Sequence, residues 1–294
     1  MSKILYCKEI AETIKQEIKQ NTEKLIAVKG ITPGLAILLV GDNPGSKVYV
    51  NSKERTCKEL GFYSVVRREQ ASFSEEEVLK VVSEWNKDDK IHGILVQLPL
   101  PKHIDEQKVI KAILPQKDVD GFHPENTGRL VIGLDSLHPC TPAGIMEVIK
   151  REKIETKGKH VVVVGRSNIV GKPITNLLYQ KNENANAIVT ICHTAAKDLK
   201  YYTRQADILV AAMGAPEVIT ADYLKDGVVI IDVGYNRVED ANDPKGYRIA
   251  GDVHFESAKE KASIITPVPG GVGLMTIAML MLNTYKAASG EIKY

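Results

Sequence analysis

The stretch HVVVVGRSNIVGKPITNLL, residues 160–178, places a run of valines, a glycine turn and an apolar helical segment in succession. A continuous apolar run is typical of a strand that is buried on both faces of a parallel sheet. Gly165 can form a tight turn after this strand, and Gly171 lets the next helix approach the strand closely. A complete G-x-G-x-x-G pattern is absent, so an ordinary strand–turn–helix connection is the alternative to a dinucleotide site.

Three more apolar runs follow this stretch and strengthen the dinucleotide interpretation. They are AIVTICH (187–193), DILVAAMG (207–214) and GVVIIDVG (227–234). Four buried strands that alternate with helical segments predict a Rossmann-like domain over residues 145–269. The backbone N–H groups of the 165–171 turn could then hold a pyrophosphate at a helix N-terminus.

The end of the second strand of this domain bears on the choice of cofactor. NAD sites usually place an acidic residue there to bind the ribose hydroxyls. This chain has Cys192, His193 and Thr194 instead, with no acidic residue before Asp198. Arg166 could meet a 2′-phosphate, which favours NADP, although a solvated loop arginine is the alternative.

The N-terminal half predicts a second parallel α/β domain. Expected strands cover 35–41, 63–69 and 91–101, and they alternate with helices over 48–61, 72–88 and 103–114. The polar stretch 115–130 is rich in turn residues and predicts an irregular loop that carries function. This domain is expected to span 1–144 and to be completed by a C-terminal helix within 270–294.

One residue on the 48–61 helix breaks the expected pattern. At about 100° per residue, Lys53 falls in the middle of the apolar arc. A lysine there either extends its ammonium group to solvent or faces a crevice, where it can act in proton transfer. Gln97 ends a buried strand, and Asp118 and Asp120 follow in the polar loop, so a lysine, an amide and a carboxylate could converge. The alternatives are that Gln97 binds loop backbone and that the aspartates only shape turns.

The composition excludes several classes of protein. The chain has 294 residues, a net charge of +2 and interspersed charges, which argues against nucleic-acid binding or a polybasic membrane patch. The longest apolar run, 274–282, is too short to span a bilayer. Four cysteines without a C-x-x-C pair predict no zinc site, no other metal site and no disulfide framework, which favours a cytoplasmic location.

Several long motifs resemble one enzyme family, the bifunctional methylenetetrahydrofolate dehydrogenase/methenyltetrahydrofolate cyclohydrolases. The motifs occur in order along essentially the whole chain: YVNSK, GILVQLPLP, KDVDGFHPEN, PCTPAG, GRSNIVGKP, ADILVAAMG, DVGYNR, GDV and TPVPGGVG. The resemblance implies NADP-dependent oxidation of methylenetetrahydrofolate, then hydrolysis to formyltetrahydrofolate, in one-carbon metabolism and purine biosynthesis. It also implies a folate cleft between the two domains and a homodimer formed through the cofactor domain.

The resemblance assigns roles to particular residues. Lys53 would transfer protons, Tyr49 would stack on the folate, Gln97 would position Lys53, and Asp120 would bind the pterin. The folate site is expected to comprise Tyr49, Lys53, Gln97, Leu98, Pro99, Asp120, Pro269, Gly270 and Gly271. The NADP site is expected to comprise Gly165, Arg166, Ser167, Ile169, Val170, His193, Thr194, Gly214 and Tyr235.

The chain departs from the family pattern at a few positions. Leu274 stands where proline is common, His254 where aspartate is usual, and Ala196 where threonine is common. Ala196 removes a possible phosphate contact. A dehydrogenase that uses NAD or lacks cyclohydrolase activity is the alternative enzyme, and a non-catalytic nucleotide-binding regulator is the alternative of another class. Such a regulator has no need of Tyr49, Lys53, Gln97 and Asp120 together.

Overall fold

The computed structural model describes residues 2–241 and 243–294, which form two compact units. The six-stranded unit combines the N-terminal segment up to Glu12 with Thr141–Thr276, and the three-stranded unit combines Thr13–Cys140 with Ile277–Tyr294. The chain is thus divided after Glu12, Cys140 and Thr276, where the sequence suggests boundaries only after residues 144 and 269. The segment up to Glu12, expected in the three-stranded unit, groups with the six-stranded unit. Each unit contains a parallel sheet with flanking helices, which confirms the predicted α/β class.

The sheet of the three-stranded unit has β2 (Gly34–Val40) at its centre, between β3 (Tyr63–Glu69) and β4 (Gly93–Val96). Both pairings are parallel, and every residue of β2 is buried. A strand buried on both faces explains the uninterrupted apolar run in the sequence. β3 has the bounds that the sequence predicts, whereas β4 ends at Val96 because the chain bends away at the following prolines.

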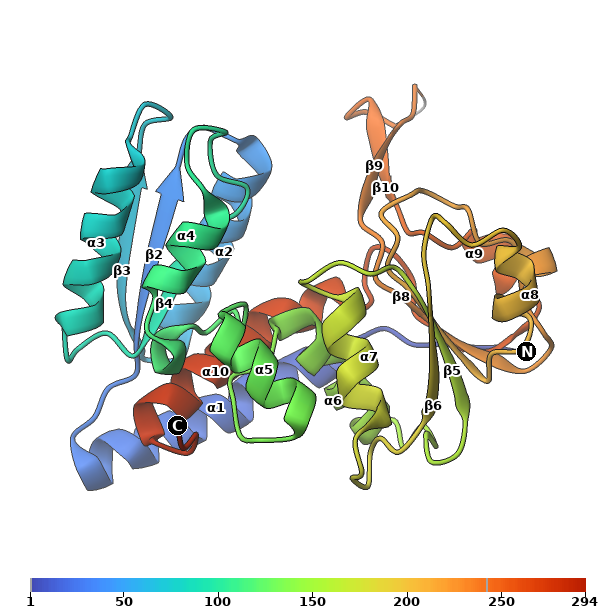
Figure 1. Cartoon of the computed structure of the whole chain (residues 1–294), viewed down its shortest axis with the longest axis horizontal. Coiled ribbons are helices and arrows are strands. Elements are labelled where there is room, and N and C mark those ends of the chain that lie inside the picture. The colour runs from blue at the N-terminus through green and yellow to red at the C-terminus, as the bar shows by residue number, and fades with distance from the viewer. Residues whose placement is uncertain (1, 242) are drawn as a thin grey trace. The chain divides into compact units, whose positions relative to one another are not determined.

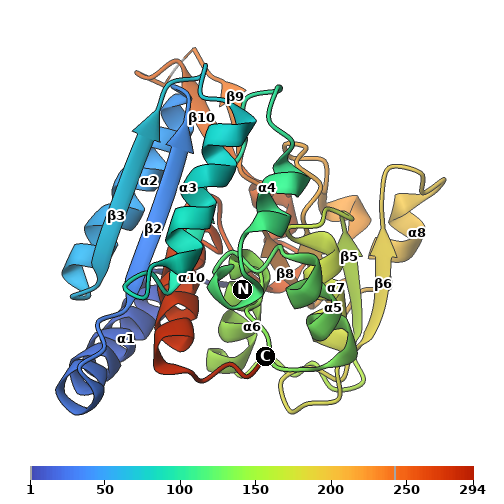
Figure 2. The ribbon, with the colours of Figure 1, turned by 60° about the vertical axis from the view of Figure 1, so that its left-hand side comes forward.

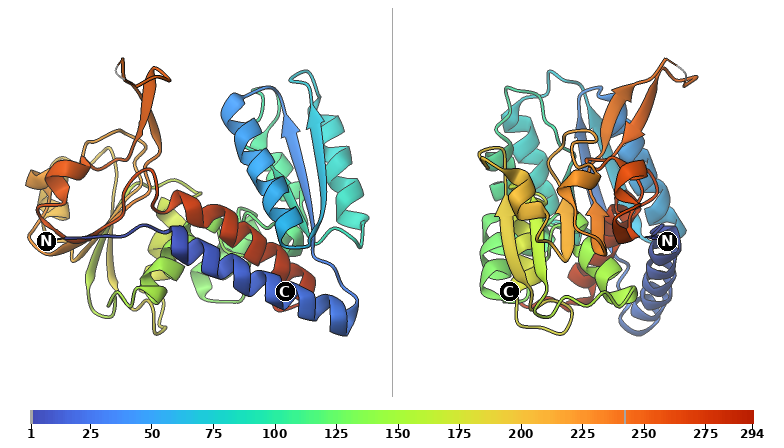
Figure 3. Two further views of the ribbon diagram at one scale, coloured as in Figure 1. Left: turned by 180° about the vertical axis from the view of Figure 1, so that it is seen from behind. Right: turned by 90° about the vertical axis from the view of Figure 1, so that its right-hand side faces the viewer.

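Helices cover both faces of this sheet. Figure 2 shows α2 on one face of β2 and β3, and α3 on the other. Leu38 and Val40 of β2 pack with Val81 and Trp85 of α3 in one apolar cluster. α1 and α10 run side by side (Figures 1 and 3). The helices of this unit, including most of α1 and α10, are α1 (Lys8–Lys29), α2 (Pro44–Glu59), α3 (Glu75–Lys87), α4 (Glu106–Ala112), the 3-10 turn η1 (Pro115–Lys117), α5 (Pro124–Ile132) and α10 (Gly273–Ser289).

The polar stretch 115–130 is less irregular than the sequence suggests, because α5 forms within it. Pro124 occupies the first turn of α5, where its missing N–H costs nothing. The ring nitrogen Nδ1 of His123 accepts a hydrogen bond from the backbone N–H of Glu125 at 3.0 Å. Gly133, at φ +75°, ends the helix in the left-handed conformation. The irregular loop is therefore confined to residues 118–123, between η1 and α5.

The six-stranded unit has the strand order β1-β11-β8-β7-β5-β6, with parallel pairing throughout. β6 and β7 lie on opposite sides of β5, so the order of strands reverses at β5. In open sheets of this kind, ligands bind at the carboxyl ends of the strands beside such a reversal. The strands are β1 (Lys3–Ile4), β5 (His160–Val164), β6 (Ile188–Cys192), β7 (Ile208–Ala211), β8 (Val228–Asp232) and β11 (Ala262–Ile265).

The remaining elements of this unit connect its strands. A hairpin of β9 (Asn236–Glu239) and β10 (Tyr247–Ala250) projects from the unit (Figure 1). The helices are α6 (Cys140–Arg151), α7 (Gly171–Tyr179), α8 (Leu199–Thr203), the 3-10 turn η2 (Ala221–Tyr223) and α9 (Phe255–Ala258).

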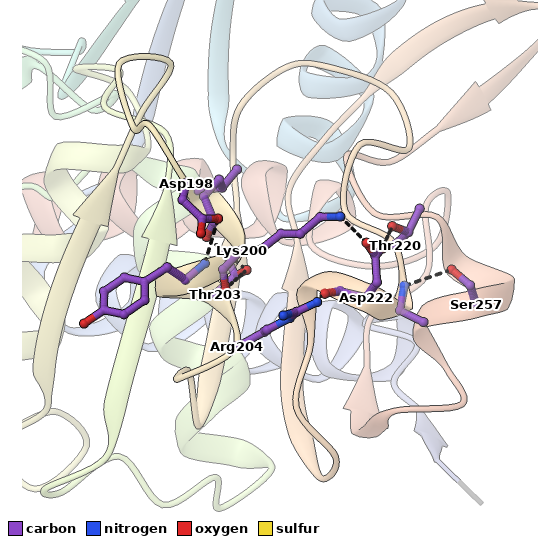
Figure 4. A network of polar contacts seen from close by, with 10 residues as sticks. Asp198, Lys200, Thr203, Arg204, Thr220, Asp222 and Ser257 are labelled. Carbon is purple, nitrogen blue, oxygen red and sulfur yellow. Dashed lines mark hydrogen bonds and ion pairs between the residues drawn. The ribbon is translucent and has the colours of Figure 1, made fainter.

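A polar network joins α8 to η2 (Figure 4). The side chain of Lys200 pairs with Asp222, and the guanidinium of Arg204 donates to the Asp222 carbonyl at 2.7 Å. The side chain of Asp198 accepts from the N–H of Tyr201 at 3.1 Å and so caps α8. No helix in the described parts of the chain is long and apolar enough to cross a membrane.

Candidate active site

Lys53 lies on the buried face of α2. The side chain of Asn43 accepts from the N–H of Ser46 at 3.0 Å and caps this helix, and Pro44 fits its first turn. Lys53 shares its face with Val50 and Cys57 and is only 8 % exposed. Its ammonium group donates a hydrogen bond to Oε1 of Gln97 at 2.9 Å. The structure therefore brings together the lysine and the glutamine that the sequence singled out.

Gln97 is fixed in one orientation at the end of β4. Its backbone N–H donates to the Leu38 carbonyl at 2.8 Å, and its amide Nε2 donates to the Leu98 carbonyl at 2.7 Å. Because the amide nitrogen is used in this way, the amide oxygen faces Lys53. Leu98 is half-buried, and Pro99, which follows a cis peptide bond, is exposed.

The two aspartates of the 118–123 loop have different surroundings. Asp118 is 2 % exposed, and its Oδ2 accepts from the N–H of His123 at 2.7 Å and from Nδ2 of Asn126 at 2.9 Å. Its carboxyl group thus ties the loop to the start of α5. Asp120 makes no such contact with the loop backbone and keeps part of its surface exposed. Asp118 therefore shapes the loop, whereas the Asp120 carboxyl group does not.

The pKa of Asp120 is raised to about 6. Loss of hydration on burial is the main cause, and it outweighs the attraction of the Lys53 ammonium group. The nearby Asp118 carboxyl raises the pKa of Asp120 further, and the Cys140 thiol opposes the shift. A carboxyl group with this pKa is mostly ionised at neutral pH and becomes protonated in mild acid.

Asn283 and Cys140, which the sequence did not single out, contact the 118–123 loop. The amide Nδ2 of Asn283 donates to the carbonyls of Val119 and His138, each at 2.9 Å. The thiol of Cys140 lies 3.4 Å from the Val119 carbonyl and 3.9 Å from Oδ1 of Asp120, and burial raises the pKa of this thiol well above its usual value. A polar residue that ends the apolar run of α10 is the signal that could have identified Asn283.

Tyr294 contacts the same loop region through its hydroxyl group. This hydroxyl lies 2.7 Å from Oδ1 of Asn126 and 2.9 Å from the Pro115 carbonyl. Asn126 in turn donates to Asp118, so a chain of hydrogen bonds leads from Tyr294 to the loop. The guanidinium of Arg129 lies over the tyrosine ring at 5.0 Å.

The remaining residues of the expected folate site lie in both units. Tyr49 is one helical turn before Lys53 on α2, and its ring is substantially exposed. Pro269, Gly270 and Gly271 belong to the six-stranded unit, in the loop between β11 and α10. The carbonyl of Gly270 accepts from the N–H of Cys7 at 3.0 Å, which fixes this loop within its own unit.

The 165–171 turn closely follows the carboxyl end of β5. Gly165 adopts φ +132°, and a Cβ atom there would lie 2.0 Å from the Ala212 carbonyl oxygen. A Cβ atom on Gly171 would lie 2.1 Å from the Gly165 carbonyl oxygen. Both positions therefore exclude any side chain, and the turn stays close enough to the sheet for its backbone to line a ligand site.

The other expected cofactor residues lie at the same edge of the sheet, because Val164 pairs with Cys192 of β6 and with Ala211 of β7. The hydroxyl of Ser167 accepts from the N–H groups of Val170 and Gly171, at 3.1 and 3.3 Å. The exposed residues are Arg166, Ser167, Ile169, Thr194, Gly214 and Tyr235, and the half-buried ones are Val170 and His193.

Within residues 2–241 and 243–294, no group of three or more His, Cys, Asp or Glu side chains could hold a metal ion.

Comparison with known proteins gives a consistent result across the chain. Residues 5–120 match the model of the tetrahydrofolate dehydrogenase/cyclohydrolase catalytic domain, and residues 139–292 match that of the NAD(P)-binding domain of the same family. The bifunctional protein FolD of Chloroherpeton thalassium is 54 % identical over 286 residues, which cover 97 % of each chain.

Solved structures agree with these matches. The bifunctional FolD methylenetetrahydrofolate dehydrogenase/cyclohydrolase of Campylobacter jejuni is 45 % identical, with a TM-score of 0.93 over 99 % of this chain and 100 % of that one. The Trypanosoma brucei methylenetetrahydrofolate dehydrogenase-cyclohydrolase, solved with NADP and an inhibitor, is 35 % identical, with a TM-score of 0.93 over 100 % of this chain and 99 % of that one.

Proposed function

Because the chain belongs to the tetrahydrofolate dehydrogenase/cyclohydrolase family, we propose that it catalyses both reactions for which the family is named. The first oxidises methylenetetrahydrofolate to methenyltetrahydrofolate with NADP as oxidant. The second hydrolyses the methenyl cation to formyltetrahydrofolate. The observation that carries this proposal is the hydrogen bond between Lys53 and Gln97 on a buried helical face, because a structural lysine would extend its ammonium group to solvent.

Lys53 is the proton-transfer group of the cyclohydrolase step. Water adds to the methenyl carbon and must lose a proton, and the ring nitrogen must gain a proton when its bond to that carbon breaks. The hydroxyl group on that carbon loses its remaining proton to solvent as the formyl carbonyl forms, so one proton is released overall. The Lys53 amine accepts the first proton and supplies the second, while the oriented Gln97 oxygen holds the amine in place. Tyr49, one turn away on the same helix, stacks on the folate.

Asp120 binds the pterin ring. The pterin amino group and a ring N–H are adjacent donors, and a carboxylate accepts from both. Asp118 is already occupied by the loop backbone and Asn126, which supports the choice of Asp120. Both activities need the same bound folate, so Asp120 serves both. Leu98, Pro99 and the loop Pro269, Gly270 and Gly271 complete the folate-binding surface.

The glycine turn fits a bound NADP. A side chain on Gly165 or Gly171 would overlap the backbone of the turn. With glycine at both positions the backbone stays open, so a pyrophosphate could approach the N–H groups at the helix N-terminus. Arg166 is exposed at the turn and would hold the 2′-phosphate, with Thr194 at the same edge of the sheet. When bound, NADP accepts the hydride from the one-carbon bridge, and this step needs positioning of the two molecules more than an acid or base.

The enzyme is a cytoplasmic homodimer. Support for the location comes from the four cysteines, which are all buried free thiols. Support for the dimer comes from β6, which lies at the end of the strand order and leaves Ile188 and Ile191 exposed. An exposed edge strand with apolar side chains is suited to pairing with a second copy.

A spectrophotometric assay with methylenetetrahydrofolate, run separately with NADP and NAD, tests this function. We expect kcat/KM to be higher with NADP, and we expect little methenyl intermediate to accumulate. Accumulation in stoichiometric amount would identify a dehydrogenase without useful cyclohydrolase activity, and equal kcat/KM values would contradict the role of the 2′-phosphate.

Arg166→Ala sharpens the cofactor assignment. We expect a loss of about tenfold to a hundredfold in kcat/KM with NADP, since a charged hydrogen bond to phosphate contributes about 1.5–3 kcal/mol. The value with NAD should hardly change. Arg204→Ala is the matched control, because its guanidinium contacts Asp222 in the α8–η2 network of the same unit (Figure 4).

A further inference from the structure

Two buried carboxyl groups near the proposed NADP site have no part in the chemistry described above. Asp232 is the last residue of β8, and Asp252 closely follows β10. They are 3 % and 0 % exposed. Acidic side chains are rarely buried this deeply, because removing a carboxylate from water is costly unless hydrogen bonds replace the lost hydration.

The carboxylate of Asp252 accepts hydrogen bonds from the loop that follows β7. Its Oδ2 accepts from the N–H groups of Met213 at 2.6 Å and Gly214 at 3.0 Å, and its Oδ1 accepts from the N–H of Ala215 at 3.0 Å. The amide of Asn236 also donates to Oδ1, at 2.9 Å. One carboxylate thus fixes three successive peptide units after β7 and a side chain from the chain that follows β8.

Asp232 holds the segments on which Asp252 depends. Its Oδ1 accepts from the N–H groups of Gly234 and Asp252, at 2.9 and 3.0 Å, and its Oδ2 accepts from the N–H of Val253 at 3.0 Å. A Cβ atom on Gly251 would lie 1.8 Å from Oδ2 of Asp232, so a side chain there would displace the carboxyl group. Burial raises the pKa of Asp232 to about 7, although the three backbone donors oppose this shift.

The two acids therefore act as one unit that joins three loops. The loop after β7 carries Gly214, and the loop after β8 carries Tyr235, and both residues belong to the expected NADP site. β7 and β8 lie on the opposite side of β5 from β6. A dinucleotide that crosses the carboxyl edge at β5 places one half toward β6 and the other toward β7 and β8. If Arg166 and Thr194 hold the 2′-phosphate at β5 and β6, as proposed above, the nicotinamide half would lie toward β7 and β8.

We propose that Asp252, held by Asp232, is a positioning residue for the nicotinamide half of NADP. It fixes the backbone of Met213–Ala215 and the side chain of Asn236, which would line this half of the site. The proposal rests on the proposed function, because it assumes NADP at the carboxyl edge of this sheet.

Asp252→Asn tests the proposal with two ligands. In the unaltered protein, backbone N–H groups donate to both carboxylate oxygens of Asp252. In either orientation of the asparagine amide, its N–H₂ group replaces one of these oxygens and faces backbone donors that have lost their acceptor. We expect the Kd of NADP to rise about fivefold to a hundredfold, the range for buried donors that lose their acceptor. Adenosine 2′,5′-bisphosphate contains only the phosphate end, so we expect its Kd to change by less than about twofold by the same reasoning. Hydrolysis of methenyltetrahydrofolate, which needs no NADP, should continue.

Two further variants make the test decisive. Asp226→Asn is the control, because this exposed acid precedes the opposite end of β8 and pairs only with Lys261 among the contacts described here. Asn236→Ala removes a single donor to Asp252, so the Kd of NADP should again rise more than the Kd of adenosine 2′,5′-bisphosphate, but by a smaller factor. This variant tests the proposal if Asp252→Asn does not fold.

Particular results would overturn the proposal. Equal loss of NADP and adenosine 2′,5′-bisphosphate binding in both Asp252→Asn and Asn236→Ala would mean that these residues only maintain the fold. Unchanged NADP binding in a folded Asp252→Asn would also refute it. If the unaltered enzyme binds neither NADP nor the bisphosphate, the proposed function itself fails, and that outcome is distinct from the other two.

Discussion

The folate side and the cofactor side of this enzyme are constructed by opposite means. In the proposed folate site of the three-stranded unit, the functional groups are the side chains of Lys53, Gln97 and Asp120, and Gln97 is oriented by its hydrogen bonds to Lys53 and to the Leu98 carbonyl. In the proposed NADP site of the six-stranded unit, Gly165 and Gly171 leave no room for side chains, and buried carboxylates hold the backbone loops in shape.

The difference predicts how each side responds to mutation. Removing a functional group from the folate side changes chemistry and leaves the backbone in place. Adding atoms to the cofactor side moves backbone that is packed against other backbone, so binding and stability change together. The two activities provide separate readouts, since only the dehydrogenase step consumes NADP.

Lys53→Met should produce the largest effect. General acid–base catalysis contributes about a hundredfold to ten-thousandfold, and we expect cyclohydrolase activity to fall by that factor. Dehydrogenase activity should fall much less, and methenyltetrahydrofolate should accumulate. The exposed Lys58, which pairs with Glu54 on the same helix, provides the control variant Lys58→Met. Hydrolysis of methenyltetrahydrofolate by Lys53→Met at the parental rate would show that Lys53 is not the proton-transfer group.

Gly171→Ala should have the opposite effect and impair the NADP-dependent step more than the hydrolysis. Its Cβ atom would overlap the Gly165 carbonyl oxygen, and relief of such overpacking costs about 1–3 kcal/mol. We expect the KM for NADP to rise more than about tenfold and the melting temperature to fall, while hydrolysis of methenyltetrahydrofolate persists. Gly128→Ala is the control, because nothing lies within 4 Å of a Cβ atom there. Equal loss of both activities would erase the distinction between the two sides.

The pH dependence of folate binding sharpens the role of Asp120. Its pKa is about 6, so below that pH the group is protonated and presents a donor to the pterin donors. The KM for methylenetetrahydrofolate should therefore rise as the pH falls below about 6, approaching tenfold for each pH unit. In Asp120→Asn the KM should be high at every pH and this dependence should vanish.

Titration of Asp120 does not unfold the protein at low pH, so unfolding caused by Asp120 does not explain the expected rise in KM. Because its pKa is higher in the folded chain than in the unfolded chain, the folded state binds the proton more tightly. The contribution of Asp120 to the free energy of unfolding therefore decreases as the pH rises from about 4 to about 6 and does not decrease on acidification. A KM that stays constant from pH 7 to pH 5 would contradict the assignment of Asp120.

Tyr294→Phe should give the smallest effect. It removes the hydroxyl that contacts Asn126 and Pro115, and loss of one such hydrogen bond costs about 0.5–1.5 kcal/mol of unfolding free energy. The KM for folate should rise only a few-fold in both activities, and the KM for NADP should not change. Tyr285→Phe, on α10 of the same unit, is the matched control. A larger effect on NADP than on folate would separate Tyr294 from the 118–123 loop.

The sequence predicted those features whose causes are local. β3 and the helix that carries Lys53 follow from apolar periodicity and from turn residues at their ends. The hydrogen bond between Lys53 and Gln97 joins residues 44 positions apart, and a lysine on an apolar arc and a glutamine at a strand end predicted it only as one of two alternatives. α5 was not predicted, because its proline and glycine look like turn residues until their places in the helix are known.

The features that were not predicted depend on residues far apart in the chain. Asn283 meets the Val119 carbonyl across a separation of 164 residues, and Asp252 meets the Met213 N–H across 39. The partners of Asp252 are mostly backbone N–H groups, which every residue type except proline carries, so no charged partner in the sequence indicates that this acid is buried. β1 has only two residues and was missed because its pairing with β11 gives it its strand character.

The pairing of β1 with β11 has a consequence for how the protein is made. Lys3 pairs with Ile264, so this contact closes a loop of about 260 residues. The three-stranded unit likewise needs residues 277–294, in which Met281 contacts Cys57. At a synthesis rate of about 5–20 residues per second, the growing chain spends roughly 15–60 seconds before either unit can be completed. From the completion of α2 until the synthesis of α10, the apolar face that Cys57 later buries against Met281 is uncovered, and exposed apolar surface of this kind makes a growing chain prone to aggregate.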